Sequence, residues 1–324
     1  MLQPLVSVIT PSYNQAAYVE QTLLSVLNQD YPAIEYIVID GASTDGSADI
    51  IRRYADRLSY WVSEPDRGQS HAINKGFARA RGEIVAWMNS DDLYTPGAVA
   101  EAVALLTSRP DVGMVYGNCL RIDADSAITS WHQSRQHDLI DLLSFSILSQ
   151  PAVFLRRELV ERVGGLDESL HMLFDHLLWL RAAAQVPILY HDRYWACARE
   201  HAEAKNFARW QHYGDEATLI LNMLDRDPAF TEIIAAHCQR IWAGRARFAG
   251  TYLAVHGEAR AALREFTTAY RLHPKTMSGS GPLLAMVALG GTGLLRSGDS
   301  FRLFQRLRRR AMRRPEVAVW PELH

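Results

Sequence analysis

Short apolar segments alternate with amphipathic segments along the first hundred residues, and this alternation limits the possible folds more than any other feature of the sequence. Apolar runs with the length of strands occupy residues 6–10, 36–39, 60–63 and 84–88. Apolar residues recur at helical spacing between these runs, in residues 17–29, 47–54 and 70–80. Strands without a polar face are typical of a parallel sheet that helices cover on both sides. The pattern predicts an α/β fold with a mostly parallel central sheet.

A cluster of polar residues follows each of the four predicted strands. These clusters are residues 11–14, 40–43, 64–66 and 89–92. The carboxyl ends of parallel strands meet at one edge of a sheet, and ligands bind there in open α/β folds. The four clusters therefore predict a single binding site at that edge.

The cluster at residues 89–92 ends in two adjacent carboxylates, Asp91 and Asp92. Carboxylate oxygens are ligands that Mg2+ and Mn2+ prefer, and these ions often share substrate phosphate oxygens with the protein. The pair is thus a candidate for holding a cation against a diphosphate. A helix N-cap at Asp92 explains the same residues equally well when the pair is taken alone.

Asp40 and Asp66 also stand at predicted strand ends, where a carboxylate can accept hydrogen bonds from a nucleobase imide or from ribose hydroxyls. The alternative is a solvated turn that caps the next helix, and Asp45 and Ser47 suit that role. Asp40 is harder to explain as a turn residue, because it closes an apolar strand. We therefore expect Asp40 and Asp66 to bind a nucleoside.

Composition and charge exclude several classes of protein. The formal net charge of −2 over 324 residues argues against a nucleic-acid partner. No basic leader opens the sequence and no run of about 18 apolar residues occurs, so we expect a cytoplasmic protein. The three cysteines, at positions 119, 197 and 238, are widely spaced and odd in number. They predict a reducing compartment and three buried thiols.

The pattern changes after about residue 201, where strand signals thin out. Residues 207–223 and 231–271 have helical spacing, and we place a domain boundary near residue 205. The predicted domains are residues 1–205, which carry the site, and a helical C-terminal extension, residues 206–324. Residues 300–314 are basic and amphipathic, which suits an interfacial helix on anionic lipid. A helix packed on the protein, or a tail, explains that segment equally well.

The ordered strand-end motifs together resemble glycosyltransferases of family 2. The similar stretches are residues 6–32, 34–47, 64–83, 84–92, 150–170, 174–181 and 198–201. The resemblance implies the GT-A fold, which is Rossmann-like, and an inverting, metal-dependent sugar transfer. It implies a nucleotide diphosphate sugar as donor, most often a UDP-sugar, and Mn2+ or Mg2+ as cofactor. The acceptor would be a saccharide or a lipid-linked sugar of cell-surface polysaccharide or glycolipid synthesis.

The resemblance also implies roles for individual residues. Asp175 matches the catalytic base, and Asp91 and His201 match residues that bind the metal or the diphosphate. The donor nucleotide would contact Pro11, Tyr13, Asn14, Asp40, Asp66 and Ser90. The sequence departs from the family pattern at Asn89, which replaces the first acid of an Asp-x-Asp motif, and at Phe174 and Leu177, where acids are frequent.

Two other functions are alternatives to sugar transfer. A sugar nucleotidyltransferase usually has a glycine-rich, basic loop after the first strand, and residues 10–15 contain neither glycine nor lysine. A relative that binds sugar nucleotides without catalysis remains open because of the departures at Asn89, Phe174 and Leu177.

Overall fold

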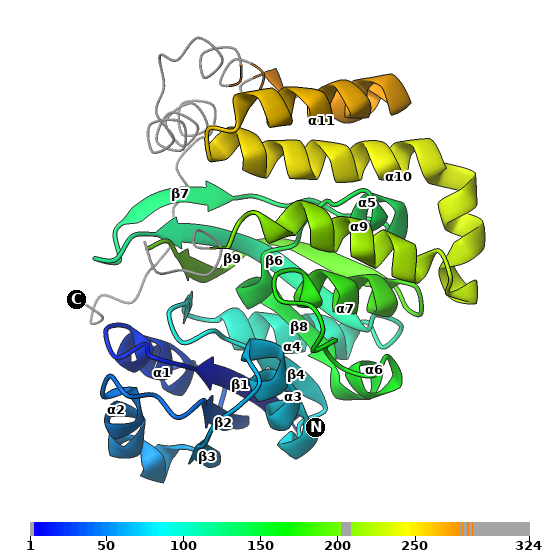
Figure 1. Cartoon of the computed structure of the whole chain (residues 1–324). Helices are drawn as coiled ribbons and strands as arrows, with labels where there is room; N and C mark the ends of the chain where they lie inside the picture. The colour runs from blue at the N-terminus through cyan, green and yellow to red at the C-terminus, as the bar shows by residue number, and fades with distance from the viewer. Residues whose placement is uncertain (1–2, 202–208, 279, 282–283, 285–286, 288–324) are drawn as a thin grey trace. The chain divides into compact units, whose positions relative to one another are not determined.

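The structure is a computed structural model that describes residues 3–201, 209–278, 280, 281, 284 and 287 (Figure 1). The chain divides into two compact units. Among the described residues, the first comprises residues 3–136 and 148–201, and the second comprises residues 137–147 and those described from 209 onward. Residues 137–147, which lie within the predicted 1–205 domain, therefore group with the C-terminal helices.

Nine strands in the described part of the first unit form one sheet. In chain order the strands are β1 (Val6–Ser12), β2 (Ile34–Asp40), β3 (Tyr60–Ser63), β4 (Ile84–Trp87), β5 (Leu93–Tyr94), β6 (Met114–Ile122), β7 (Ile128–His132), β8 (Val153–Arg156) and β9 (Ile188–Arg199). Their order across the sheet is β3-β2-β1-β4-β8-β6-β9-β5, and β7 pairs with β6.

The sheet is mostly parallel, as the sequence predicts. β2 and β4 run parallel to β1, and β3 runs parallel to β2. β8 is antiparallel to both β4 and β6, so β6 runs in the direction of β4, and β9 is parallel to β6. The carboxyl ends of β1, β2, β3, β4, β6 and β9 consequently lie at the same edge of the sheet.

Helices cover both faces of this sheet, because alternate side chains of each buried strand point to opposite sides. Val6 and Val8 of β1 pack in one core cluster with α1 (Val19–Leu27), α2 (Ser47–Arg53) and α4 (Ala98–Ser108). On the opposite face, α3 (Gln69–Arg79) packs on β1, where Gly76 lies directly against Ile9. The same unit also contains α6 (Arg157–Arg162) and α7 (Phe174–Ala183).

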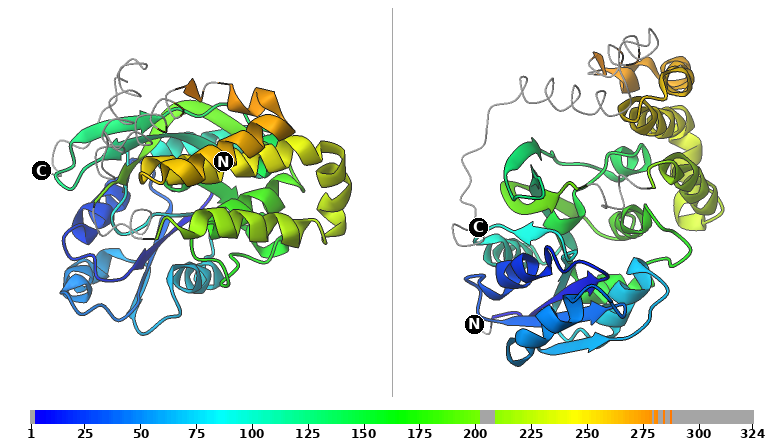
Figure 2. Two further views of the ribbon diagram at one scale, coloured as in Figure 1. Left: turned by 45° about the horizontal axis from the view of Figure 1, so that its top comes forward. Right: turned by 60° about the vertical axis from the view of Figure 1, so that its left-hand side comes forward.

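The second unit is helical in its described residues (Figure 2). Its helices are α5 (Leu139–Leu143), α9 (His212–Leu224), α10 (Pro228–Val255) and α11 (Ala259–Leu272). The predicted helical segment 231–271 is interrupted twice: α10 kinks at His237, and Gly257, with φ of 86°, follows its end. Gly244 of α10 lies against the main chain of Ser144, which follows α5. Phe145 stacks on Phe248 of α10 with ring centroids 5.2 Å apart.

Several expectations from the sequence need correction or lie outside the described residues. Cys119 and Cys197 are buried, but Cys238 is exposed, because it lies on an outer face of α10. β7 was not predicted, and β9 is longer than the predicted strand near residue 188. Among the described residues, no helix is long and apolar enough to span a bilayer. The basic segment 300–314 falls outside the described residues.

Candidate active site

The structure places the four polar clusters at the shared carboxyl edge of the sheet. Ser12 and Asp40 are direct neighbours at the ends of β1 and β2, and Asp40 pairs with Ser63 at the end of β3. Asn89 follows β4, which is parallel to β1. His201 follows β9, which ends at the same edge. The predicted gathering of these segments is therefore present.

Asp40 is fully buried, and its carboxylate holds the loop that follows β2. Oδ2 accepts hydrogen bonds from the Ser43 amide at 2.9 Å and from the Ser63 hydroxyl at 2.6 Å. Oδ1 accepts one from the Ser43 hydroxyl at 2.5 Å. Protein groups thus bind both oxygens, and this arrangement fixes the loop at the strand end.

Asp66 lies beside this loop. Its Oδ1 accepts a hydrogen bond from the Gly68 amide at 2.7 Å. A Cβ atom at position 41 would lie 2.6 Å from Asp66 Oδ2 and 3.3 Å from Cδ2 of Tyr13. Gly41 is therefore the residue that lets the three segments approach each other. The Tyr13 side chain is 62% exposed, so its ring is available to a planar ligand.

Asn14 joins the loop after β1 to the loop after β2. Its φ of 52° is in the left-handed region, and its Oδ1 accepts a hydrogen bond from the Thr44 amide at 2.9 Å. The Asn14 amide in turn donates to the Ser43 hydroxyl at 2.8 Å. Pro11 is buried in β1 opposite Ile39. The first-strand residues predicted to bind the nucleotide are thus held in a defined loop beside Asp66.

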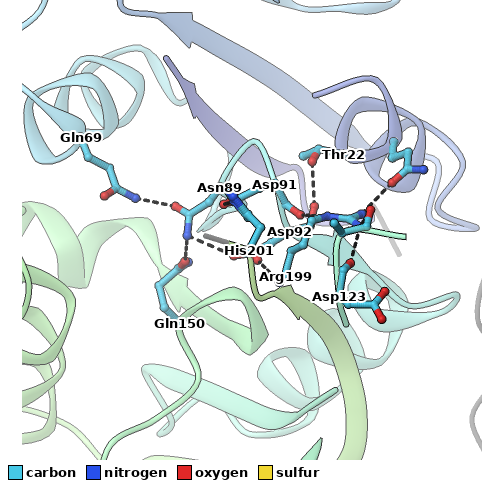
Figure 3. Close-up of polar contacts among 11 residues, drawn as sticks. Thr22, Gln69, Asn89, Asp91, Asp92, Asp123, Gln150, Arg199 and His201 are labelled. Atoms are coloured by element: carbon cyan, nitrogen blue, oxygen red, sulfur yellow. Dashed lines mark hydrogen bonds and ion pairs between the residues drawn. The ribbon is translucent and has the colours of Figure 1, made fainter. Parts of the chain in front are cut away.

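The turn of residues 89–92 forms a network of buried polar contacts (Figure 3). The Asn89 amide donates from Nδ2 to Asp92 Oδ2 at 3.1 Å and to Gln150 Oε1 at 3.0 Å. Its Oδ1 accepts a hydrogen bond from Gln69 Nε2 at 2.7 Å. Ser90 is buried within the turn. Asn89 therefore organises the turn through both ends of its amide, which a carboxylate at this position cannot do.

Asp91 and His201 meet at the sheet edge. Nε2 of His201 lies 3.1 Å from Oδ2 of Asp91, and their side chains are 6% and 18% exposed. The His201 ring also packs against Tyr18, with ring centroids 4.8 Å apart. Residues 110 positions apart in the sequence are thereby brought to one point.

Asp92 is the buried carboxylate of the turn and differs from Asp91 in its surroundings. Its Oδ1 accepts a hydrogen bond from the Arg199 amide at 2.9 Å. Burial, followed by the charge of Asp91, raises the pKa of Asp92 to about 8. Asp92 therefore accepts hydrogen bonds from groups inside the protein, and Asp91 is the carboxylate nearer to solvent.

Asp175 begins α7, and topology brings this end of the helix to the same edge. Residues 184–187 connect the end of α7 directly to the start of β9. The start of β9 lies at the edge of the sheet opposite to the carboxyl edge, so the start of α7 is directed toward the carboxyl edge. Trp179, one turn after Asp175 on the same helix face, stacks on Trp87 at the end of β4 with centroids 5.1 Å apart. Asp175 is partly buried, and its Oδ1 accepts a hydrogen bond from the His176 amide at 2.7 Å.

The residues at positions 91 and 201 fit a divalent cation as two of its ligands. These two atoms hydrogen-bond directly to each other at 3.1 Å. Two ligands side by side on an octahedral ion with bonds of 2.1 Å are about 3.0 Å apart, so an ion could take the place of this hydrogen bond. Within the described residues no group of three or more His, Cys, Asp or Glu side chains is placed to hold a metal ion. Asp91 and His201 would therefore hold such an ion only with oxygen ligands from a substrate and water.

Four residues of this site were not singled out from the sequence. They are Tyr18, Gln69, Gln150 and Arg199. All four lie within stretches whose motifs did stand out, but single polar residues next to a motif carry no signal of their own. Their importance appears only through contacts with segments that are distant in the sequence.

The chain is similar to known glycosyltransferases. The sequence profile of "Glycosyl transferase family 2" matches residues 7–164. A protein of Bacillus subtilis named as the putative teichuronic acid biosynthesis glycosyltransferase TuaG is 40% identical over 160 residues, which are 48% of this chain and 64% of the relative. An uncharacterized glycosyltransferase of Mycobacterium tuberculosis is 32% identical over 186 residues, which are 56% of this chain and 69% of the relative.

The chain covers less than two thirds of the first relatives' length: 64% of the Bacillus protein and 58% of an uncharacterized glycosyltransferase of Rickettsia typhi.

Solved structures share the fold. S. aureus TarS 1–349 in complex with UDP-GlcNAc gives a TM-score of 0.60 at 19% identity, covering 95% of this chain and 92% of that one. The mannosyltransferase PcManGT from Pyrobaculum calidifontis, in complex with GDP-Man and Mn2+, gives a TM-score of 0.59 at 24% identity. That match covers 94% of this chain and 85% of the neighbour. At these identities the likeness establishes the GT-A-like fold alone.

Proposed function

The chain belongs to glycosyltransferase family 2, and we propose that it transfers a sugar from a nucleotide diphosphate sugar to an acceptor hydroxyl group with inversion of the anomeric centre. The observation that carries this proposal is the 3.1 Å contact between Asp91 and His201 at the carboxyl edge of the sheet. Two potential cation ligands, neither of them part of a protein-only cage, suit a site that a diphosphate completes.

The nucleoside would bind between the loops after β1, β2 and β3. Asp66 and Tyr13 lie against Gly41, where the absence of a side chain lets these loops approach one another closely. Asn14 and Asp40 hold the two loops in place, and Pro11 and Ser90 complete the predicted set. UDP is the proposed nucleotide, and a TarS structure with UDP-GlcNAc is one of the fold neighbours.

Asp175 is the proposed catalytic base. A carboxylate at this edge accepts the proton of the acceptor hydroxyl group while the oxygen of that hydroxyl group forms a bond to the anomeric carbon. The bond from that carbon to the diphosphate oxygen breaks at the same time, and its electron pair leaves with the nucleotide diphosphate. Attack from the side opposite to the leaving group inverts the anomeric centre.

The proposed cofactor is Mn2+ or Mg2+, which Asp91 and His201 would hold. When bound, such an ion offsets negative charge that develops on the departing diphosphate. Asp92 supports this pair from inside the protein: it accepts hydrogen bonds from Asn89 and from the Arg199 amide. A structure of PcManGT with Mn2+ among the fold neighbours supports the choice of ion.

The name of one relative supports a proposal for the acceptor class. One of them is named for teichuronic acid biosynthesis, and we propose a saccharide or lipid-linked acceptor of cell-surface polysaccharide or glycolipid synthesis. A cytoplasmic enzyme with peripheral membrane contact through residues 300–314 suits such an acceptor. Co-sedimentation of the full chain with anionic liposomes, compared with that of a chain truncated before residue 277, tests this contact. Equal recovery of both chains in the pellet would exclude membrane contact through this segment.

A non-catalytic relative is the second candidate, because acids frequent in the family are replaced here. Phe174 and Leu177 are both buried in the packing of α7. The two apolar residues that replace the family's acids therefore contribute to the core. The carboxylate of Asp175 remains at the helix start, which favours catalysis.

The test is release of nucleotide from a panel of nucleotide sugars by the purified chain with Mn2+. We expect release from at least one UDP-sugar, loss of release with a chelator, and loss in Asp91→Ala and Asp175→Asn. No release from any donor, or release that survives both substitutions, would contradict the proposal.

A further inference from the structure

Arg199 links three segments that are far apart in the sequence. Its guanidinium group donates from Nε to the Asp91 carbonyl at 2.9 Å and from Nη2 to Gln21 Oε1 at 2.6 Å. Nη1 donates to the carbonyls of Asp123 and Ala124, at 2.9 and 3.1 Å. The residue is only 5% exposed, so these contacts are sheltered from water.

The contacts converge on the turn that carries Asp91. The Arg199 side chain fixes the Asp91 carbonyl, while its own amide binds Asp92 Oδ1 at 2.9 Å. The Asp92 carbonyl accepts a further hydrogen bond from Thr22 of α1 at 2.8 Å. Because Arg199 is also the last residue of β9, it sets the point from which the chain reaches His201.

Tyr18 completes this arrangement. The guanidinium carbon of Arg199 lies 4.8 Å from the centre of the Tyr18 ring. The His201 ring packs against the same tyrosine, with centroids 4.8 Å apart. Tyr18 thus contacts both residues and links Arg199 to the His201 ring.

We propose that Arg199 is a positioning residue of the donor site, which rests on the function proposed above. It holds the Asp91 main chain and the end of β9 so that Asp91 Oδ2 and His201 Nε2 are placed for a cation before the donor arrives. Arg199 itself touches no reacting atom. Its guanidinium group is directed to main-chain carbonyls and Gln21 within the protein.

The physical reason is preorganisation. A turn that is already fixed loses little conformational freedom when the ligand binds, whereas a loosened turn must be ordered at the cost of affinity. Residues that orient metal ligands typically change metal affinity by about 10–100-fold when they are replaced. Lysine cannot replace arginine here, because a single ammonium group cannot hydrogen-bond to the Asp91 carbonyl, the carbonyls of residues 123 and 124 and Gln21 at the same time.

Arg156 provides a matched control. It also binds three main-chain carbonyls: Nε donates to Val112 at 2.8 Å, and Nη2 donates to Leu106 at 2.7 Å and to Arg109 at 3.3 Å. It ends β8 opposite Ile84, the first residue of β4, and therefore lies at the edge of the sheet away from the site. Replacing Arg156 removes a comparable set of contacts without touching the proposed donor site.

The experiment is calorimetric titration of the full chain with UDP and with GDP, each in the presence of Mn2+, alongside thermal unfolding of the unliganded protein. We expect Arg199→Lys to weaken nucleotide binding by about 10–100-fold. Arg156→Lys should lower the melting temperature to a similar degree and leave the dissociation constant within about twofold, because distant sites are nearly independent.

Gln21→Leu keeps Arg199 and removes its hydrogen bond to Gln21. This variant tests the inference if Arg199→Lys does not fold. It should weaken binding by about threefold to tenfold. Equal dissociation constants for the wild-type protein, Arg199→Lys and Gln21→Leu would overturn the inference, as would equal losses in Arg199→Lys and Arg156→Lys. Failure of the wild-type protein to bind either nucleotide would instead overturn the proposed function and the inference with it.

Discussion

His201 Nε2 lies 3.1 Å from Asp91 Oδ2, and both side chains are largely buried at the carboxyl edge of the sheet. The two residues follow different strands, β4 and β9, which β8 and β6 separate in the sheet. Only the common direction of β4 and β9 brings them together.

Removal of one member of this pair should raise the Mn2+ concentration that is needed for activity. For His201→Ala we expect the Mn2+ concentration at half-maximal activity to rise by about tenfold or more, since a direct ligand matters at least as much as a supporting residue. His212→Ala, in the second unit, serves as the control. An unchanged metal requirement in His201→Ala would exclude His201 as a ligand.

Asp175→Asn should separate binding from chemistry. Loss of a general base typically lowers the rate by about 10²–10⁴-fold, whereas the affinity for the nucleotide should stay the same. Steady-state kinetics and calorimetry on the same preparation check both parts. Asp111→Asn, which removes an exposed partner of Arg109, is expected to leave both quantities unchanged. A variant that retains full turnover would show that another group takes the proton.

Asn89→Asp, which restores the family's first acid, should destabilise this chain. The aspartate would lose the donor to Asp92 and Gln150 and add a charge beside Asp92. We expect the free energy of unfolding to fall by about 1–3 kcal/mol, without tighter Mn2+ binding. Urea denaturation measures the loss, and the exposed substitution Asn28→Asp is the control. A more stable or tighter-binding Asn89→Asp variant would contradict this role for Asn89.

Glu35 predicts a pH dependence of stability in the first unit. Burial alone would raise the pKa of Glu35, but hydrogen bonds from Ser7 and Arg81 outweigh it and hold the pKa below its usual value. The folded pKa is thus below the unfolded value of about 4.3. The carboxylate therefore contributes stability above pH ~4.3, and this contribution disappears as the pH falls through the folded pKa.

Glu35→Gln should accordingly cost about 1–3 kcal/mol at pH 7 and less as the pH falls. Chemical denaturation at several pH values measures this difference, and the exposed substitution Glu158→Gln provides the control. A cost that is independent of pH would show that the charge of Glu35 contributes nothing.

Gly244→Ala tests the packing inside the second unit. A Cβ atom at this position would lie 2.6 Å from Cα of Ser144, so α10 and the segment after α5 would have to separate. We expect a loss of about 1–3 kcal/mol. At Gly214 the nearest atom would be 3.3 Å away, and Gly214→Ala should change the stability by less than about 1 kcal/mol. Equal effects of the two substitutions would contradict the packing of α5 on α10.

The sequence predicted the elements that obey a simple period. The buried strands at Val6–Ser12 and Ile34–Asp40 and the helix at Gln69–Arg79 lie within a few residues of their predicted positions. β7 escaped prediction, because Ile128–His132 is only partly buried and alternates weakly. The turn between α10 and α11 also escaped, since Gly257 alone interrupts the helical spacing.

Site residues were predictable where they end a strand. Asp40 and Asp91 stand out because a carboxylate after an apolar run is unusual. Gln150 and Arg199 do not stand out, because their partners, Asn89 and the Asp91 carbonyl, are 61 and 108 residues away. Nothing in a linear pattern indicates such contacts. Only the pairing of β4, β8, β6 and β9 creates them.

The most direct test of the central claim is the position of Mn2+ in crystals grown with UDP and Mn2+, located by anomalous diffraction. We expect one ion within about 2.0–2.2 Å of Asp91 Oδ2 and His201 Nε2 and in contact with the diphosphate. An ion and diphosphate bound away from both residues, or a diphosphate held at the sheet edge with no ion beside Asp91, would contradict this claim.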